Sequence, residues 1–390
     1  MMIHKYLNEM NCMGCKMCGD LCPKQAITFK INEEGFWYPE VDEEKCIKCG
    51  LCVKRCPEQN MPGNHCFMPE VYAAWVKDDD IRAKSTSGGM YYVFAKNIID
   101  NGGYIVGSQY GEDWKSANHE IYNSYEGLEK LIGSKYFQSD TEGIYNKVKE
   151  KLDNGETVLF SGCPCQSAAL QSFLNKDYDN LITFDFICRG INSPKVFHKY
   201  VSDLEKKYGS KVKKVRLRDK SKGWESLGNT IEFENGEKFY ADKNDDYYVK
   251  GFSSENLYMR PSCVECKFKG LPRISDISAG DFWGIEGQAE NEVFKGISVL
   301  MINSKKGKKF FDKIIPYIVY EMKDIKDAVS KNPCILYCVP KGRNRRMFFD
   351  NFEKMSFAEN VEICSRKSIF VKCNDVLKLI YNRIVGKKNI

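Results

Sequence analysis

The first 60 residues contain two short blocks of cysteine whose spacing suits iron–sulfur chemistry. In each block three cysteines recur at every third position, a fourth follows four residues later, and a proline comes directly after it. The cysteines are Cys12, Cys15, Cys18 and Cys22 in one block and Cys46, Cys49, Cys52 and Cys56 in the other. Two intervening residues let the chain turn tightly, so three successive thiolates face three corners of one 4Fe–4S cube. The spacing therefore predicts two clusters and electron transfer.

The fourth corner of each cube needs a ligand from elsewhere, and in bacterial two-cluster ferredoxins the other block supplies it. We therefore assign Cys12, Cys15, Cys18 and Cys56 to one cluster, and Cys46, Cys49, Cys52 and Cys22 to the other. Structural zinc fits less well, since zinc ribbons separate their two cysteine pairs by roughly 15–20 residues. A disulfide framework is typical of small secreted chains, whereas this one begins MMIHKYLNEMNC, without a signal-peptide pattern. We expect a cytoplasmic protein.

The composition is that of an ordinary globular protein with two or three domains. The chain has 390 residues, of which 43% are hydrophobic. No window approaches 18 uninterrupted apolar residues, so we expect no membrane span. The formal net charge of +6 treats cysteine as neutral. Because each bound cluster with its four thiolates subtracts about two charges, three clusters bring the total near zero. Basic and acidic residues also alternate along the chain, so we expect no nucleic-acid binding.

The cysteine blocks predict a ferredoxin-like module over residues 1–62. The hydrophobic pattern predicts that a mixed-sheet α/β domain is fused to it. In the module, a hairpin is expected from Ala26–Ile31 and Phe36–Val41. From residue 71, strands alternate with helices, which favours a mixed, largely parallel sheet. Strands are expected at VYAAWV, YIVGSQY, VLFSG, LITFDFIC, KVRLRDK and ISVLMIN, with a hairpin at NTIEFENGEKFYAD. Helices are expected over 90–100, 141–152, 166–174, 194–208 and from about 305, and helical periodicity with a basic flank recurs at Asp375–Val385.

Cysteine recurs in three further segments: SGCPCQ with Cys163 and Cys165, FICRG with Cys188, and RPSCVECK with Cys263 and Cys266. The first two follow predicted strands, and ligands bind outside the carboxyl ends of strands in open α/β sheets. Cys165, Cys188, Cys263 and Cys266 together would complete a third cluster. Scattered buried cysteines and a zinc site are the alternatives. Cys66, in the segment after the module, is interpreted as a spare thiol.

Two small-residue turns carry groups suited to a cofactor. Ser85, Thr86, Ser87, Gly88 and Gly89 directly precede the helix predicted from Met90, so hydroxyls and amides converge on a helix N-terminus, where anions bind. Plain capping of that helix explains the same residues. The second turn, Gly133, Ser134, Lys135 and Tyr136, offers a cation and an aromatic ring, or is an ordinary loop.

Taken together, these segments resemble the coenzyme F420 hydrogenase/dehydrogenase beta-subunit family. The resemblance rests on six motifs in order: STSGGM, GSKYFQSD, VLFSGCPCQSAAL, FDFICRGINSPKVF, RPSCVECKFK and SDISAGDFWG. It spans roughly residues 71 to 303, with the ferredoxin module as a common N-terminal fusion. It implies an FAD-binding domain over 71–190, a cluster-bearing part over 191–310, and an extension of unknown role over 311–390.

The resemblance implies an iron–sulfur flavoprotein that binds FAD and is a ferredoxin- or F420-linked oxidoreductase. Cys165, Cys188, Cys263 and Cys266 match the family's cluster ligands, while Ser85–Gly89 and Gly133–Tyr136 match segments that line its FAD. Cys163 departs from the pattern, which usually has Thr before Pro-Cys-Gln, so either Cys163 or Cys165 is the ligand.

The predicted mechanism is a relay. A ferredoxin or another redox partner exchanges electrons with the N-terminal clusters, the third cluster carries them inward, and FAD exchanges a hydride with coenzyme F420 or another small molecule. We predict that Lys135 stabilises the anionic reduced flavin and thus acts in catalysis. Trp283 is interpreted as a flavin-packing or a core residue. The alternatives are an electron-transfer subunit of a larger redox complex, and a redox or structural partner in surface-polysaccharide biosynthesis.

Overall fold

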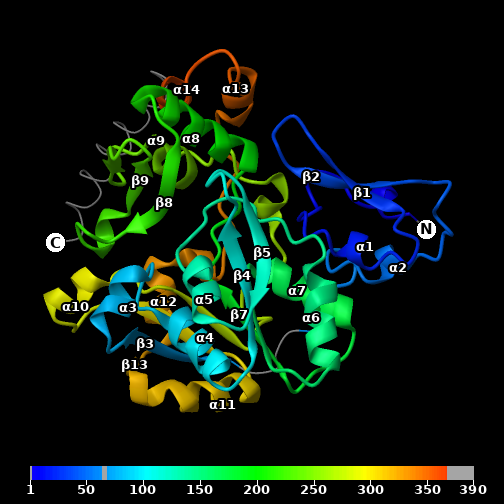
Figure 1. Ribbon diagram of the computed structural model, residues 1–390, viewed down its shortest axis with the longest axis horizontal. Coiled ribbons are helices and arrows are strands. Elements are labelled where there is room, and N and C mark those ends of the chain that lie inside the picture. Colours follow the sequence, from blue (N-terminus) through cyan, green and yellow to red (C-terminus); the bar gives the residue numbers. More distant parts are fainter. Residues whose placement is uncertain (1, 64–67, 367–390) are drawn as a thin grey trace, which may run out of the picture.

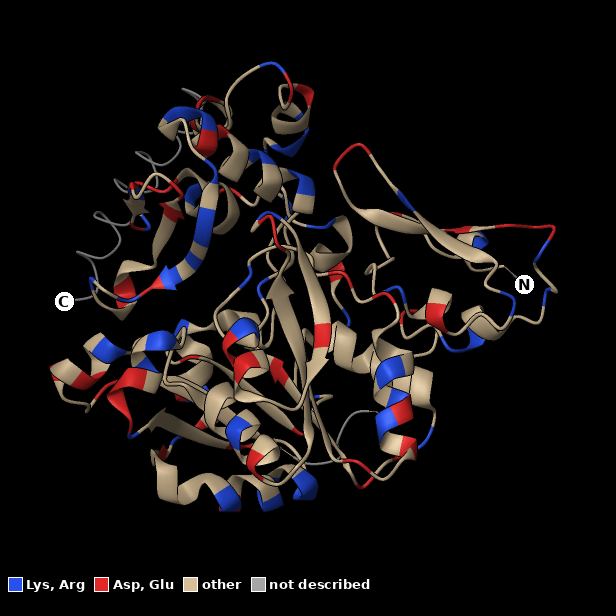
Figure 2. Ribbon diagram, in the orientation of Figure 1, with Lys and Arg blue, Asp and Glu red and all other residues tan. Residues whose placement is uncertain are grey.

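The structure, a computed structural model, describes residues 2–63 and 68–366. A small N-terminal module lies beside a larger domain that contains one long sheet and one short sheet (Figure 1). Cys66 and the predicted helix at Asp375–Val385 lie outside the described residues. Acidic and basic segments are interspersed over both parts, and β8 carries a long basic stretch (Figure 2).

The N-terminal module is built around the predicted hairpin. Its elements are η1 (Ile3–Lys5), α1 (Met17–Asp20), β1 (Ile27–Ile31), β2 (Trp37–Val41) and α2 (Leu51–Lys54). The two strands are antiparallel, with Ile27 opposite Val41 and Ile31 opposite Trp37, which confirms the predicted hairpin. The third cysteine of each block, Cys18 or Cys52, lies in one of the single-turn helices, α1 or α2. Residues Lys16 and Gly50, which precede these helices, adopt the left-handed conformation needed for the tight turn.

The long sheet has eight strands among the described residues, in the order β13-β3-β12-β11-β7-β6-β4-β5. The strands are β3 (Glu70–Val76), β4 (Tyr104–Tyr110), β5 (Ala117–Tyr122), β6 (Val158–Gly162), β7 (Leu181–Phe186), β11 (Ile277–Asp281), β12 (Ser298–Ile302) and β13 (Ile318–Met322). The strands predicted at VYAAWV, YIVGSQY, VLFSG, LITFDFIC and ISVLMIN all lie in this sheet. The mixed α/β class predicted from the sequence is thereby confirmed.

The sheet is less parallel than predicted. Parallel pairing is confined to β11, β7, β6 and β4 in the centre, whereas the outer strands pair antiparallel. A parallel neighbour needs a crossover of about a dozen residues or more. Only residues 111–116 separate β4 from β5, so these two strands form an antiparallel hairpin. The carboxyl ends of the parallel strands nevertheless meet at one edge of the sheet.

Helices cover both faces of the long sheet. In β3, Tyr72, Ala74 and Val76 pack with α4 (Met90–Asp100), α5 (Tyr125–Leu131) and α11 (Lys305–Ile314). The alternate residues Ala73 and Trp75 face a second core with α12 (Ile325–Lys331). At the other end of that face lie α6 (Ile144–Asp153) and α7 (Pro164–Leu174). The helices predicted over 90–100, 141–152, 166–174 and from 305 are thus present, with small differences at their ends.

The remaining elements are α3 (Asp79–Lys84), α10 (Glu290–Lys295), η2 (Trp224–Ser226), η4 (Pro261–Glu265), η5 (Ile315–Tyr317) and η6 (Pro333–Ile335).

The short sheet has the order β10-β9-β8 and forms its own aromatic core. Its strands are β8 (Val212–Asp219), β9 (Gly228–Phe233) and β10 (Lys238–Ala241), and the packed helices are α8 (Pro194–Tyr208), α9 (Tyr247–Val249), η3 (Lys250–Ser254), α13 (Arg345–Asp350) and α14 (Phe357–Ser365). The predicted hairpin β9–β10 and the predicted helix over 194–208 are confirmed. Residues 311–366 belong to both parts of the domain, since β13 closes the long sheet and α14 packs in the short-sheet core.

One buried arginine fastens the module to the domain. The Arg260 guanidinium, 1% exposed, donates to the carbonyl oxygens of Cys12 (2.7 Å) and Trp37 (3.0 Å) and to Oε1 of Gln138 (2.9 Å). Lys16 adds ion pairs of 2.7 and 2.8 Å to Asp140 and Glu142. Because these bonds join segments far apart in sequence, they fix the module against the α/β domain.

We expect Arg260→Met to lower the free energy of unfolding by about 3 kcal/mol. The substitution leaves three buried acceptors without their charged donor, and each costs on the order of 1–3 kcal/mol. Arg346→Met is the matched control, because that side chain is 96% exposed and makes only a 3.7 Å ion pair within its own helix; its expected change is within about 0.5 kcal/mol. Denaturant unfolding of both variants measures the difference. Equal changes would show that Arg260 does not hold the module.

Candidate functional site

The four cysteines assigned to the first cluster face one another. Burial raises the pKa of the Cys18 thiol, and the neighbouring Cys15, Cys12 and Cys56 add to the rise. Burial likewise raises the pKa of Cys56 to about 11, while hydrogen bonds from the amides of Gln59 and Glu58 oppose it. The structure therefore brings Cys56, from the second block, to the three cysteines of the first block, as the exchange of ligands between blocks requires.

The second group of cysteines surrounds a small hollow at the outer end of the module. Cys22, Cys46, Cys49 and Cys52 all line it. The Ala26 amide donates to Sγ of Cys22 at 3.3 Å, a type of contact that stabilises a thiolate. Cys49 is exposed to solvent. The residues predicted to hold the second cluster are thus together, and this group is the one that reaches the surface.

The third group comes from three separate segments of the α/β domain. Burial raises the pKa of the Cys266 thiol, and Cys165, Cys263 and Cys188 contribute to the rise, so all four predicted ligands lie near one another. The hydrogen bond from Cys163, and then the cations Lys269 and Arg273, lower the pKa of Cys188 to about 7 against the effect of burial. Cys163 is therefore a fifth thiol of the same group. Cys165 also lies near Cys15, so the first and third groups are neighbours.

The described residues offer no site for a single metal ion. Over residues 2–63 and 68–366, no three His, Cys, Asp or Glu side chains form a group suited to one metal ion. The assignment of the three cysteine groups to 4Fe–4S clusters rests on their spacing in the sequence and stays a prediction.

A cavity of about 550 Å³ lies where the parallel strands end. Its wall includes the carboxyl-end residues Ser108 of β4, Gly162 of β6 and Asp281 of β11. Cofactor sites typically measure about 300–1,000 Å³, so a dinucleotide-sized ligand is within range. The cavity also borders Cys15, Cys163 and Cys165, and it thus adjoins two of the three cysteine groups.

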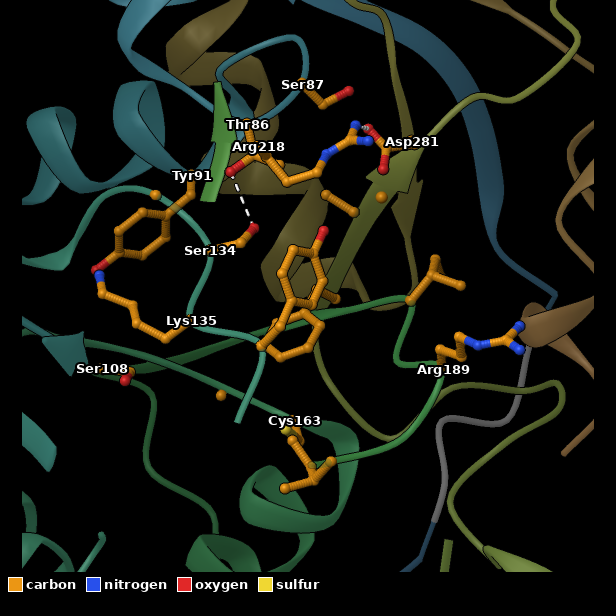
Figure 3. A pocket seen from close by; sticks show the side chains of 18 of the residues that line it. Thr86, Ser87, Tyr91, Ser108, Ser134, Lys135, Cys163, Arg189, Arg218 and Asp281 are labelled. Carbon is orange, nitrogen blue, oxygen red and sulfur yellow. Dashed lines mark hydrogen bonds and ion pairs between the residues drawn. The ribbon is translucent and has the colours of Figure 1, made fainter. Parts of the chain in front are cut away.

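Both predicted cofactor turns line this cavity. The lining residues among them are Ser85, Thr86, Ser87, Gly89, Gly133, Ser134, Lys135 and Tyr136. Gly88 is the exception, because it packs behind the turn: a Cβ atom there would lie 2.4 Å from the carbonyl oxygen of Ala74. Figure 3 shows the two turns meeting at Thr86 and Ser134, whose hydroxyl oxygens are 3.0 Å apart. Two segments about 50 residues apart in sequence therefore form one wall.

The buried side chain of Lys220 holds the first turn in place. The Lys220 ammonium donates to the carbonyl oxygens of Arg82 (2.6 Å), Ser87 (2.7 Å) and Lys295 (2.7 Å). Burial lowers the pKa of Lys220 to about 7, with the nearby cations Arg82 and Arg218 acting in the same direction. Gly88 donates its amide to Oγ of Ser298 at 2.9 Å. The turn is thereby anchored to β12. The hydroxyl groups of Ser85 and Ser87 donate to the carbonyl oxygens of Ile81 (2.8 Å) and Ile297 (3.0 Å).

Lys135 both caps α5 and lines the cavity. Its ammonium donates to the carbonyl oxygens of Lys130, Leu131 and Ile132 at 3.0–3.2 Å and so caps the C-terminal end of α5. Burial lowers its pKa to about 7. A negative ligand in the cavity would favour the charged form. The side chain therefore combines a capping contact with a position on the cavity wall.

The sequence did not identify a further part of the cavity wall, to which Arg218, Asp281 and Trp283 contribute. Arg218 donates to Asp281 at 2.9 Å, and the Trp224 indole donates to the same carboxylate at 2.7 Å. Trp283 stacks on Trp224 with ring centroids 4.6 Å apart, and it is half-buried at the cavity. Of these residues, the sequence points only to Trp283, through GDFWG. Arg218 reaches the cavity from the short sheet, and only the tertiary arrangement shows this.

The module, the cysteine groups and the cavity define the class of an iron–sulfur redox protein. Residues 11–60 match the model of the 4Fe-4S dicluster domain, and residues 155–328 match the model of the C terminus of the coenzyme F420 hydrogenase/dehydrogenase beta subunit. These matches support the resemblance: four of its six motifs lie within residues 155–328, and both cysteine blocks lie within residues 11–60.

Known structures and proteins give two further findings. In a xenon derivative of the F420-reducing [NiFe] hydrogenase complex from Methanosarcina barkeri, one chain aligns with a TM-score of 0.48 and 19% identity, over 70% of this chain and 91% of that one. No curated protein matches.

Of the described helices, none has the length and apolar character needed to cross a bilayer.

We expect Gly88→Ala to lower the free energy of unfolding by about 1–3 kcal/mol, as overpacking does. The added Cβ would meet the Ala74 carbonyl oxygen at 2.4 Å and the Ser298 amide nitrogen at 3.0 Å, both of them backbone atoms that cannot step aside. Gly63→Ala is the control, because no atom of the described residues lies within 4 Å of a Cβ there. Denaturant midpoints of the two variants test this. A Gly88→Ala midpoint equal to the control would mean that the turn is not fixed against the sheet.

Proposed function

We propose that the protein is an iron–sulfur flavoprotein oxidoreductase that relays single electrons through 4Fe–4S clusters to or from FAD, and exchanges a hydride with coenzyme F420 or another organic substrate. One observation carries this proposal. A single cavity is bordered by both predicted flavin-binding turns and by cysteines of two cluster groups. An organic cofactor in that cavity would therefore lie directly beside the cluster ligands.

The positions of the cysteine groups support a path for the electrons. Cys49 of the second group is exposed, the first group lies inside the module, and Cys15 of the first group is near Cys165 of the third. Electrons would then pass between a redox partner, such as a ferredoxin, and the outer group, and continue through the first and third groups to the cavity. Thiolates hold the clusters, and backbone amides such as that of Ala26 tune them.

The cavity suits an anionic ligand such as FAD. Among its described lining residues the cations are Lys135, Arg189, Arg218 and Lys331, against one carboxylate, Asp281. The turn at Ser85–Gly89 precedes α4, and backbone amides at a helix N-terminus are of the kind that hold phosphate. Bound flavin would supply the link between one-electron clusters and two-electron hydride chemistry. The residues present therefore fit the cofactor, and Lys135 is placed to balance negative charge on the ring.

A second candidate function is an electron-transfer subunit of a larger redox complex. The edge strand β13 favours it, because Tyr320 (41%) and Met322 (66%) are exposed beside an unpaired strand edge. Turnover of the isolated chain with an artificial electron donor separates the two functions. Activity without any partner chain supports the first, and activity only in a complex supports the second.

The proposal is tested by the iron, acid-labile sulfide and flavin content of the anaerobically purified, cluster-reconstituted chain. We expect about twelve iron atoms and one FAD per chain, as three four-iron clusters require. About eight iron atoms without flavin would restrict the redox chemistry to the N-terminal module and contradict the proposal.

We expect each single cysteine variant to lose the iron of one cluster only. Cys266→Ser should lower the content to about eight iron atoms while leaving the module's clusters intact, and Cys49→Ser should remove about four from the module. Cys364→Ser is the control, since this buried cysteine lies in the short-sheet core. Cys163→Ser and Cys165→Ser then identify the remaining ligand of the third group. A full iron content in Cys266→Ser would rule out the third cluster as proposed.

A further inference from the structure

The third cysteine group contains five thiols, one more than a 4Fe–4S cluster binds. After burial, the charges that raise the pKa of Cys263 and of Cys266 are those of thiols, and both sets contain Cys165 and Cys188. The thiols that act on Cys163 are Cys165 and Cys188. Four thiols therefore surround one space, and Cys163 lies beside the edge of this set that Cys165 and Cys188 form.

Burial separates the fifth thiol from the other four in the same way. Cys165, Cys188, Cys263 and Cys266 are each only partly buried, as thiols that face a common space must be. Cys163 is 4% exposed. Its side chain therefore packs behind the set of four.

The backbone of Cys163 is fixed by the start of a helix. Cys163 is the single residue between β6 and α7, and Figure 3 shows it where that helix begins. Its amide donates to Oε1 of Gln166 (2.8 Å), and its carbonyl oxygen accepts from the amide of Ser167 (3.0 Å). Gly162 leaves room for this contact, since a Cβ atom there would lie 2.9 Å from Oε1 of Gln166. Cys163 is thus held in place by the helix start, whether or not a cluster is bound.

We propose that Cys163 is a positioning residue whose thiol donates a hydrogen bond to the ligand sulfur of Cys188, while Cys165 completes the third cluster. The Cys163 side chain hydrogen-bonds to both Cys165 and Cys188. Beside an anionic cluster this thiol keeps its proton, because a further negative charge is disfavoured there. The inference rests on the proposed function, which supplies the third cluster.

The hydrogen bond from Cys163 acts on the reduction potential of that cluster. Hydrogen bonds to the ligand sulfurs are among the factors that set the potential of an iron–sulfur cluster. Reduction adds one electron, so a donor to a ligand sulfur stabilises the reduced form more than the oxidised form. Cys163 therefore raises the potential of the third cluster. Cys163 and Cys165 also border the cavity, so this donor lies on the side from which electrons would reach it.

Iron content tests whether Cys163 is a donor or a ligand. The measurement uses the full, anaerobically reconstituted chain, for which about twelve iron atoms are expected. Cys163→Ala should also hold about twelve, since no ligand is lost. Cys334→Ala is the matched control, because Cys334 also borders the cavity but is not one of the five thiols. A loss of about four iron atoms in Cys163→Ala would make Cys163 a ligand and overturn the inference.

The reduction potential tests the hydrogen bond itself. Electron paramagnetic resonance follows the third cluster during a redox titration, and the spectrum of Cys266→Ser, which lacks that cluster, is subtracted. At a fixed potential, Cys163→Ala should hold about threefold to tenfold less reduced third cluster, and tenfold corresponds to about 59 mV for one electron. Cys163→Ser keeps a hydroxyl donor, so it should stay within about twofold of the unmodified chain. Cys334→Ala should show no shift.

The remaining outcomes separate this inference from the proposed function. An unchanged potential in Cys163→Ala, or an equal shift in Cys163→Ala and Cys163→Ser, would overturn the hydrogen bond while the third cluster stands. If the unmodified chain holds only about eight iron atoms, the third cluster of the proposed function is absent, and the inference fails with it.

Discussion

The position of the N-terminal module against the α/β domain depends on one buried guanidinium group, that of Arg260. Arg260 directly precedes the segment that carries Cys263 and Cys266, and its side chain donates to the carbonyl oxygens of Cys12 and Trp37. The approach is close enough that Gly14 must lack a side chain: a Cβ there would be 2.6 Å from Nη1 of Arg260. The residue before the third cysteine group thus holds the loop of the first group. Since electron transfer requires short separations, this contact sets the distance on which the proposed relay depends.

The sheet topology places the ligands around that contact. Parallel strands are confined to the centre of the long sheet, and their carboxyl ends share one edge. Cys163 and Cys188 follow two of these strands, and the cavity opens at the same edge. The antiparallel strands extend the sheet, and β5 and β12 add His119 and Ser298 to the cavity wall. The module then closes the edge from outside and brings Cys15 near Cys165.

Local signals in the sequence predicted the cysteine blocks, most helices and strands, and the two cofactor turns. The residues that the sequence did not identify reach the cavity through long-range contacts. The cysteine blocks follow from spacing alone, and the helix over 90–100 is bounded by Gly89 and the Asn101 turn. Tyr91 and Ser108 also line the cavity but carry no such signal, because an aromatic residue in a first turn and a serine in a strand are ordinary. Arg218 reaches the cavity only through the fold of the short sheet. The sequence groups Gly88 with the residues of a cofactor turn, yet its lack of a side chain serves packing against β3.

The distribution of cations gives the net charge of +6 a physical explanation. Arg260 lies between the first and third cysteine groups, and it lowers the pKa of Cys263 against the dominant effect of burial. Lys269 and Arg273 act in the same way on Cys188. Each cluster with its thiolates is anionic, and buried anions are tolerated only beside compensating charge. Excess basic residues in this chain therefore balance groups that would lie inside it, so the sign of the formal charge is no guide to an external partner.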